Sequence, residues 1–170
     1  MAGVIATGGA DGLVRLWDPL TSALVGEPVR GHTDAVRSLA AGGARRTLLA
    51  SASDDRTIRV WDPVSRKAAG PPLAGHERWV HSVAFLTPPG GGPLVVSGGG
   101  DRTVRVWEPH TGQCRLTLRR RTPVRSVATS GALLAIGDDE GVSVIEIDAA
   151  ALAGSAADRR GFRLAPSRKG

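Results

Sequence analysis

The chain is organised around one short pattern that recurs four times along its 170 residues. The clearest copy, residues 48–63, has a small apolar arm, the turn-forming sequence Asp-Asp-Arg, and a second arm rich in β-branched and aromatic residues. Two such arms around a short polar turn predict a β-hairpin, and Pro63 marks its end because proline cannot donate a ladder hydrogen bond. The other copies lie at residues 6–19, 97–109 and, in weaker form, 135–148. A chain of repeated hairpins is predicted to be all-β.

The four hairpins share one internal spacing. In every copy an aspartate stands six residues before an apolar residue at or near the end of the second arm. The pairs are Asp11 and Trp17, Asp55 and Trp61, Asp101 and Trp107, and Asp139 and Ile145. Successive pairs are about 40 residues apart, a period typical of repeat architectures in which each repeat is one supersecondary unit.

A second element precedes the two central hairpins and points to a family. Gly31-His32 and Gly75-His76 open these units, and Trp61-Asp62 and Trp107-Glu108 close them. With Gly-His at the start and Trp-Asp at the end, residues 2–147 resemble the WD-repeat β-propeller family. The resemblance implies an all-β propeller segment of about four four-stranded antiparallel blades. Inner strands are then expected near residues 35–40, 80–86 and 124–129.

The same resemblance divides the chain into units. The propeller segment is residues 1–148, with an incomplete first blade at 2–30 and further units at 31–74, 75–118 and 119–148. Residues 149–170 form a basic tail that is either one outer strand or disordered. A ring of the seven blades usual in the family would need roughly 300 residues, so we expect an open arc. Self-association or further blades would be needed to complete the ring.

The resemblance also gives a structural role to residues that could otherwise suggest a Ser-His-Asp catalytic triad. In WD repeats the turn aspartate, the histidine, a strand hydroxyl and the tryptophan indole form one buried hydrogen-bond network. The implied members are His32, Ser53, Asp55 and Trp61 in the second unit, His76, Asp101 and Trp107 in the third, and Asp11, Trp17 and Asp139 in the outer units. Gly99 stands where the third unit should carry its hydroxyl. A buried serine bonded to an indole is not a nucleophile, so we expect no catalytic residue.

Family resemblance places the partner-binding surface at the entrances to the inner strands. By register, the candidates are Arg37, Asp54, Trp79, His81 and Arg125. Trp79 is the one tryptophan outside the Trp-Asp position, and an aromatic residue beside arginine is typical of an interface anchor. The chain is therefore predicted to be a non-catalytic scaffold for protein–protein interaction, without a cofactor.

Charge leaves an alternative open. The net charge is +6, and the basic residues are arginines apart from Lys67 and Lys169. Basic runs such as residues 119–121 could bind nucleic acid or another acidic ligand, so a module of that kind is the alternative, with an enzyme third. The four histidines lack the spacing typical of zinc ligands, and no metal site is expected.

Cysteine usage and hydropathy bear on localisation. The single Cys114 excludes a disulfide within the chain, and no apolar run reaches the roughly 20 residues of a membrane span. The first residues carry neither the basic nor the long apolar region of a signal peptide. We therefore expect a cytoplasmic protein without a membrane partner.

Overall fold

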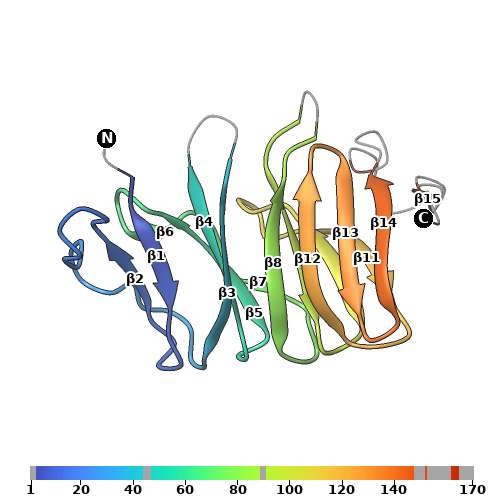
Figure 1. Cartoon of the computed structure of the whole chain (residues 1–170), viewed down its shortest axis with the longest axis horizontal. Helices are drawn as coiled ribbons and strands as arrows, with labels where there is room; N and C mark the ends of the chain where they lie inside the picture. Colours follow the sequence, from blue (N-terminus) through green and yellow to red (C-terminus); the bar gives the residue numbers. More distant parts are fainter. Residues whose placement is uncertain (1–2, 44–46, 89–90, 148–151, 153–161, 165–170) are drawn as a thin grey trace.

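The fold is a row of β-sheets. The computed structural model describes residues 3–43, 47–88, 91–147, 152 and 162–164, and within them the chain forms fifteen β-strands. Figure 1 shows these strands as sheets standing side by side, from the β1–β2 hairpin at one end to the sheet of β12, β13 and β14 at the other. The two end sheets lie apart. The expected all-β propeller segment of about four blades with an unclosed ring is thus confirmed.

Each sheet corresponds to one repeat. The first sheet contains β1 (Ile5–Gly8) and β2 (Val14–Trp17). The second contains β3 (Val36–Gly42), β4 (Leu48–Ser53), β5 (Thr57–Asp62), β6 (Lys67–Ala68) and β7 (Leu73–Ala74). The third contains β8 (Val80–Leu86), β9 (Leu94–Gly99), β10 (Thr103–Trp107) and β11 (Cys114–Arg119). The fourth contains β12 (Val124–Ser130), β13 (Leu133–Asp138), β14 (Gly141–Ile147) and β15 (Phe162–Leu164).

Neighbouring strands in each sheet are antiparallel and follow chain order. β3, β8 and β12 are the inner strands of the second, third and fourth sheets. Pro71 and Pro72 divide the outer strand of the second sheet into β6 and β7, both of which pair with β5. In the first sheet, isolated bridges join β2 to Leu24 and Val29. β15 pairs with β14 as an outer strand from the basic tail, and the remainder of that tail, apart from Leu152, lies outside the described residues.

The apolar cores lie between sheets, because alternate residues of a strand face opposite neighbours. Ile58 and Val60 on β5 join the core between the second and third sheets, whereas Trp61 joins the core between the first and second. Trp107 repeats the placement of Trp61 one sheet later. Ile145 occupies the corresponding position in the core between the third and fourth sheets. Each of the two central blades is thus held by its two neighbours.

The outward faces of the two end sheets carry apolar side chains at the surface. Ile5 on β1 is 52% exposed, and Val142 on β14 is 78% exposed. Leu133 and Val144 on the fourth sheet are exposed as well. These faces correspond to the sides that are buried between sheets elsewhere in the row.

Candidate functional site

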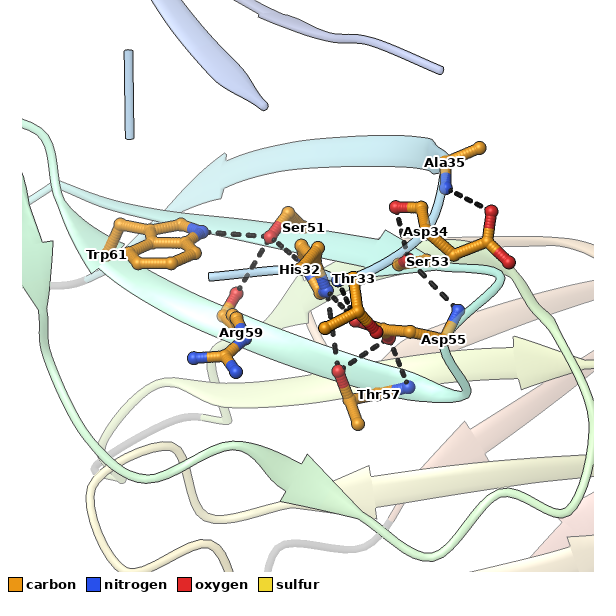
Figure 2. A network of polar contacts seen from close by, with 10 residues as sticks. All are labelled: His32, Thr33, Asp34, Ala35, Ser51, Ser53, Asp55, Thr57, Arg59 and Trp61. Atoms are coloured by element: carbon orange, nitrogen blue, oxygen red, sulfur yellow. Dashed lines mark hydrogen bonds and ion pairs between the residues drawn. The ribbon is translucent and has the colours of Figure 1, made fainter. Parts of the chain in front are cut away.

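A chain of hydrogen bonds crosses the second blade from Trp61 to Asp55 (Figure 2). The indole Nε1 of Trp61, on β5, donates to Ser51 Oγ on β4 at 2.8 Å. Ser51 Oγ lies 2.7 Å from Nε2 of His32, which stands four residues before the start of β3, and His32 Nδ1 lies 2.7 Å from Asp55 Oδ2 in the β4–β5 turn. The Thr57 hydroxyl donates to the other Asp55 oxygen at 2.7 Å. The relay joins β4, β5, the turn between them and the segment that leads into β3.

The partners of His32 determine how its protons are arranged. A carboxylate only accepts hydrogen bonds, so Nδ1 of His32 carries a proton and donates to Asp55. Nε2 of the neutral ring then accepts the Ser51 hydroxyl proton. The pKa of His32 is below its usual value, mainly because burial disfavours the charged ring, although Asp55 opposes this shift. Burial acts to raise the pKa of Asp55, but the hydrogen bonds from Thr57 and His32 outweigh it and hold that pKa below its usual value.

The third blade contains the same relay. Trp107 Nε1 donates to Ser97 Oγ at 2.8 Å, and Ser97 Oγ lies 2.8 Å from His76 Nε2. His76 Nδ1 lies 2.9 Å from Asp101 Oδ2, and Thr103 donates to Asp101 at 2.8 Å. Burial lowers the pKa of His76 as it does that of His32. The two central blades are therefore built on equivalent polar networks.

The assignment of Ser53 to this network was wrong, because Ser51 supplies the hydroxyl. Trp61 lies opposite Leu49 in the β4–β5 ladder, so its indole reaches the next residue on the same face, Ser51, rather than the more distant Ser53. Ser53 instead donates to the Asp34 carbonyl at 3.0 Å and accepts the Asp55 N–H at 3.1 Å.

For the same reason Gly99 does not replace a hydroxyl residue in the third blade. Ser97 supplies the hydroxyl of the third blade, as Ser51 does in the second. A Cβ on Gly99 would lie 2.7 Å from His76 Nδ1. Gly99 therefore lets His76 approach Asp101. The missed signal is a hydroxyl ten residues before the tryptophan that ends each of the first three hairpins: Thr7 and Trp17, Ser51 and Trp61, Ser97 and Trp107.

The outer blades retain only parts of the network. In the first blade Trp17 donates to Thr7 Oγ1 at 2.8 Å, while Asp11 pairs with Arg15 at 2.7 Å on the surface. In the fourth blade Arg120 stands at the histidine position and donates to Asp138 at 2.8 Å. Both arginine pairs hold a turn aspartate that a histidine holds in the central blades.

Asp139, expected in the buried network, lies on the surface instead. Its carboxylate pairs with Arg125 at 3.0 Å, and its side chain is about half exposed, whereas the side chain of Asp138 is almost completely buried. The cause is the turn: Asp138 pairs directly with Gly141, which leaves two residues in the turn. Shortening the turn moves the buried role from Asp139 to Asp138.

A groove of about 760 Å³ opens at the end of the strands where these turns lie. Four of the five predicted partner-binding residues line it: Asp54, Trp79, His81 and Arg125. The fifth, Arg37, lies beside the groove and donates from Nε to Asp54 Oδ2 at 2.8 Å. The other residues that line the groove are Thr33, Asp34, Asp55, Arg56, Glu77, Arg78, Gly100 and Pro123. Three successive blades thus contribute to one concave surface.

The wall of the groove combines one apolar ring with many charges. Trp79 is 56% exposed, the only tryptophan among the large exposed apolar residues of the described chain. Burial, and then the charge of Arg125, lower the pKa of His81 below its usual value. His81 therefore contributes a neutral imidazole to the groove at neutral pH. The arrangement offers an aromatic face, hydrogen-bond donors and carboxylates.

Across the described residues, His, Cys, Asp and Glu do not gather in a group of three or more that could hold a metal ion. In the same part of the chain, no helix has the length and apolar character needed to cross a membrane.

Comparison with known proteins identifies the family. The family model for the WD domain, G-beta repeat, matches residues 2–18, 24–62 and 71–108, which together exceed half of the chain. A search of the curated proteins found no match. Among solved structures, the chain is similar to the computationally designed Ika4 protein, with a TM-score of 0.72 and 27% identity over 85% of this chain and 86% of that one. The repeated sheets, the two Trp-Ser-His-Asp relays and the family match agree: the chain belongs to the WD-repeat family.

Proposed function

We propose that the chain is a non-catalytic scaffold that binds a protein partner in the groove at the inner-strand entrances. Proteins with WD repeats generally mediate protein–protein interactions. The observation that carries the proposal is Trp79, whose ring is exposed in the wall of a concave surface. Covering an exposed indole removes apolar surface from water, and tryptophan is among the residues that most often dominate binding energy at interfaces.

The geometry of the second-blade relay supports the non-catalytic part of the proposal. Ser51, His32 and Asp55 contact one another in the order of a catalytic triad. Ser51 is fully buried, however, and its oxygen already accepts the Trp61 indole proton. A nucleophile must approach a substrate atom closely, and a side chain in this position has no path to one. The relay instead satisfies polar groups inside the blade.

Arginine pairing favours a protein partner over nucleic acid. Arg15, Arg37, Arg120 and Arg125 each pair with an aspartate of the same chain. A phosphate backbone would have to compete with these carboxylates for the guanidinium groups. The positive charge that remains is spread along the chain, with few aromatic rings for base stacking.

The proposal extends to assembly and location. The apolar outward faces of the first and fourth sheets, with Ile5 at one end and Val142 and Val144 at the other, support contact with further blades or with a second copy of the chain. A cytoplasmic location agrees with the single Cys114, which cannot form a disulfide within the chain.

The test begins by capturing the partner at the groove. A photo-crosslinking amino acid replaces the exposed Arg56 in the groove wall, and a control replaces Val64, which is exposed but does not line the groove. A protein that crosslinks from position 56 and not from position 64 is purified and titrated against the unmodified chain. Capture from both positions, or from neither, contradicts the proposal.

The titration then assigns the anchor. Trp79→Ala should weaken binding by about 2 kcal/mol, roughly 30-fold, as loss of an interface anchor does. Val64→Ala should leave the affinity unchanged. The thermal midpoint of Trp79→Ala should stay within about 2 °C of the wild type, because the ring is not part of a core. Unchanged affinity of Trp79→Ala would refute its role, and tight binding of duplex DNA that falls steeply with salt would favour the nucleic-acid alternative.

A further inference from the structure

The inner edge of the first sheet differs from that of every other sheet. Among the described strands β1 pairs with β2 alone, whereas its counterparts β4, β9 and β13 each lie between two strands. The counterparts follow from register, since Ile5 lies opposite Trp17 as Leu49 lies opposite Trp61. The open edge of β1 is therefore the place where the other three sheets carry β3, β8 and β12.

Backbone groups of β1 point out from this edge. The Gly9 N–H donates to the Leu13 carbonyl at 3.0 Å, across the hairpin to β2. Successive residues of a strand direct their N–H and C=O groups to opposite sides. The backbone N–H and C=O groups of Ala6 and Gly8 therefore point away from β2, toward the open edge. An edge of this kind is a template for pairing with another extended segment.

An apolar pocket of about 240 Å³ lies beside the same edge. It is at the opposite end of the strands from the groove that contains Trp79, so the two surfaces are separate. Its walls come from the first two sheets, with Val4, Ala6 and Leu16 on one side and Leu39, Ala40 and Leu49 on the other. In the second and third sheets the inner strand places Ala40 and Ala84 against the neighbouring cores. The pocket marks the corresponding place in the first sheet, where a side chain could be buried.

The three inner strands show which sequence fits such an edge. Each has seven residues and begins with the pattern Val-(Arg/His)-Ser-(Leu/Val)-Ala. The serine of one strand accepts a hydrogen bond from the fourth residue of the next: the Val83 N–H donates to Ser38 Oγ at 3.2 Å, and the Val127 N–H donates to Ser82 Oγ at 3.0 Å. A strand with the same pattern on β1 would place its serine to accept from the Leu39 N–H.

We propose that the open edge of β1 and the adjoining pocket bind an extended polypeptide segment with the pattern Val-X-Ser-(Leu/Val)-Ala by strand addition. The segment runs antiparallel to β1. In the second sheet Ala40 lies opposite Ala50, and Ser38 opposite Ala52, so the alanine of the bound segment lies opposite Ala6 and its serine opposite Gly8. Main-chain hydrogen bonds hold the segment, and its alternate apolar side chains select it.

A synthetic peptide with the sequence of residues 122–130, TPVRSVATS, is the probe. Two variants of it differ only in the position of one N-methyl group. Methylation at the alanine of the pattern removes an N–H that faces β1, whereas methylation at the valine before it removes an N–H that points away from β1. The unmodified peptide and the valine-methylated peptide should bind with similar affinity. The alanine-methylated peptide should bind about tenfold more weakly or not at all, since it loses a ladder hydrogen bond and clashes with the edge.

Failure to bind the unmodified peptide at millimolar concentration, or equal losses with both methylated peptides, would overturn the proposal. Light scattering gives a further test. If the chain is a dimer, and the peptide neither binds to the dimer nor dissociates it, a second copy of the chain occupies the edge and the proposal is wrong. On the protein side, Ala6→Pro should abolish peptide binding while keeping the β1–β2 ladder, since the Ala6 N–H faces the open edge. Trp79→Ala should bind the peptide normally, which separates this surface from the groove. If Ala6→Pro loses the first hairpin, the two methylated peptides still decide the question.

Discussion

Replacing Ser51 with alanine tests the second-blade relay most directly. The Ser51 hydroxyl accepts a hydrogen bond from the Trp61 indole N–H and donates one to His32, and all three side chains are buried. Ser51→Ala leaves the indole N–H and the imidazole Nε2 without partners, at a cost of about 1–3 kcal/mol each. The methyl group preserves the packing, so we expect the free energy of unfolding to fall by about 2–4 kcal/mol. In a domain of this size that corresponds to a thermal midpoint lowered by roughly 5–15 °C.

Thr7→Ala is the matched control in the first blade. Thr7 accepts the Trp17 indole proton at the same 2.8 Å, from the same position ten residues earlier, but Thr7 is exposed. Water can replace its hydroxyl, so this substitution should cost under about 1 kcal/mol. Urea unfolding monitored by tryptophan fluorescence gives both values. If the two substitutions lower the free energy of unfolding equally, or if Ser51→Ala lowers it by under about 1 kcal/mol, then buried groups without hydrogen-bond partners do not determine the loss of stability.

Three further outcomes are expected. The free energy of unfolding should fall as the pH is lowered from about 7 to about 5. The pKa values of His32 and His76 are lowered in the folded chain, so in this range the unfolded chain takes up protons that the folded chain does not. Equal free energies of unfolding from urea titrations at the two pH values would contradict this. Asp138→Ala should lower the thermal midpoint more than Asp139→Ala does, because Asp138 is the enclosed partner of Arg120 and Asp139 is exposed; equal midpoints for the two variants would count against the exchange of roles. In light scattering at micromolar concentration the wild type should self-associate and Val144→Lys should do so less, so a monomeric wild type would argue against the end-face contacts.

Much of the fold follows from the sequence because repetition supplies the register. The inner strand expected at residues 80–86 coincides with β8. The spacing of aspartate and tryptophan locates each hairpin, and alternation along β5 separates Ile58 from Trp61. Period-two burial is a local rule, so one copy of the pattern is enough to apply it. The outer strands were harder to predict, since Pro71 and Pro72 leave β6 and β7 with two residues each.

Atomic partners inside the network depend on cross-strand geometry, which nearness in sequence does not give. Ser53 is closer in sequence to Asp55 than Ser51 is, and both serines face the same side of β4. The diagonal reach of Trp61 from its position opposite Leu49 decides between them. In the fourth blade the six-residue spacing pointed to Asp139, and one fewer residue in the turn transferred the buried position to Asp138. Sequence can locate such a turn, but its hydrogen bonds depend on its length.

Neighbouring aspartates in a blade turn connect the buried network to the groove. In the second blade Asp55 faces inward and bonds to His32, while Asp54 bonds to Arg37 beside the groove. The relay thus fixes the conformation of the turn that presents Asp54.

The fourth blade reaches the same division with a shorter turn. Asp138 faces inward toward Arg120, and Asp139 pairs outward with Arg125, which lines the groove. In both blades the aspartate that bonds to His32 or Arg120 is the direct neighbour of one that pairs with an arginine at the groove, so the blade interior helps to hold the groove rigid. A partner therefore meets a surface whose charged side chains are already positioned, which reduces the conformational entropy lost on binding.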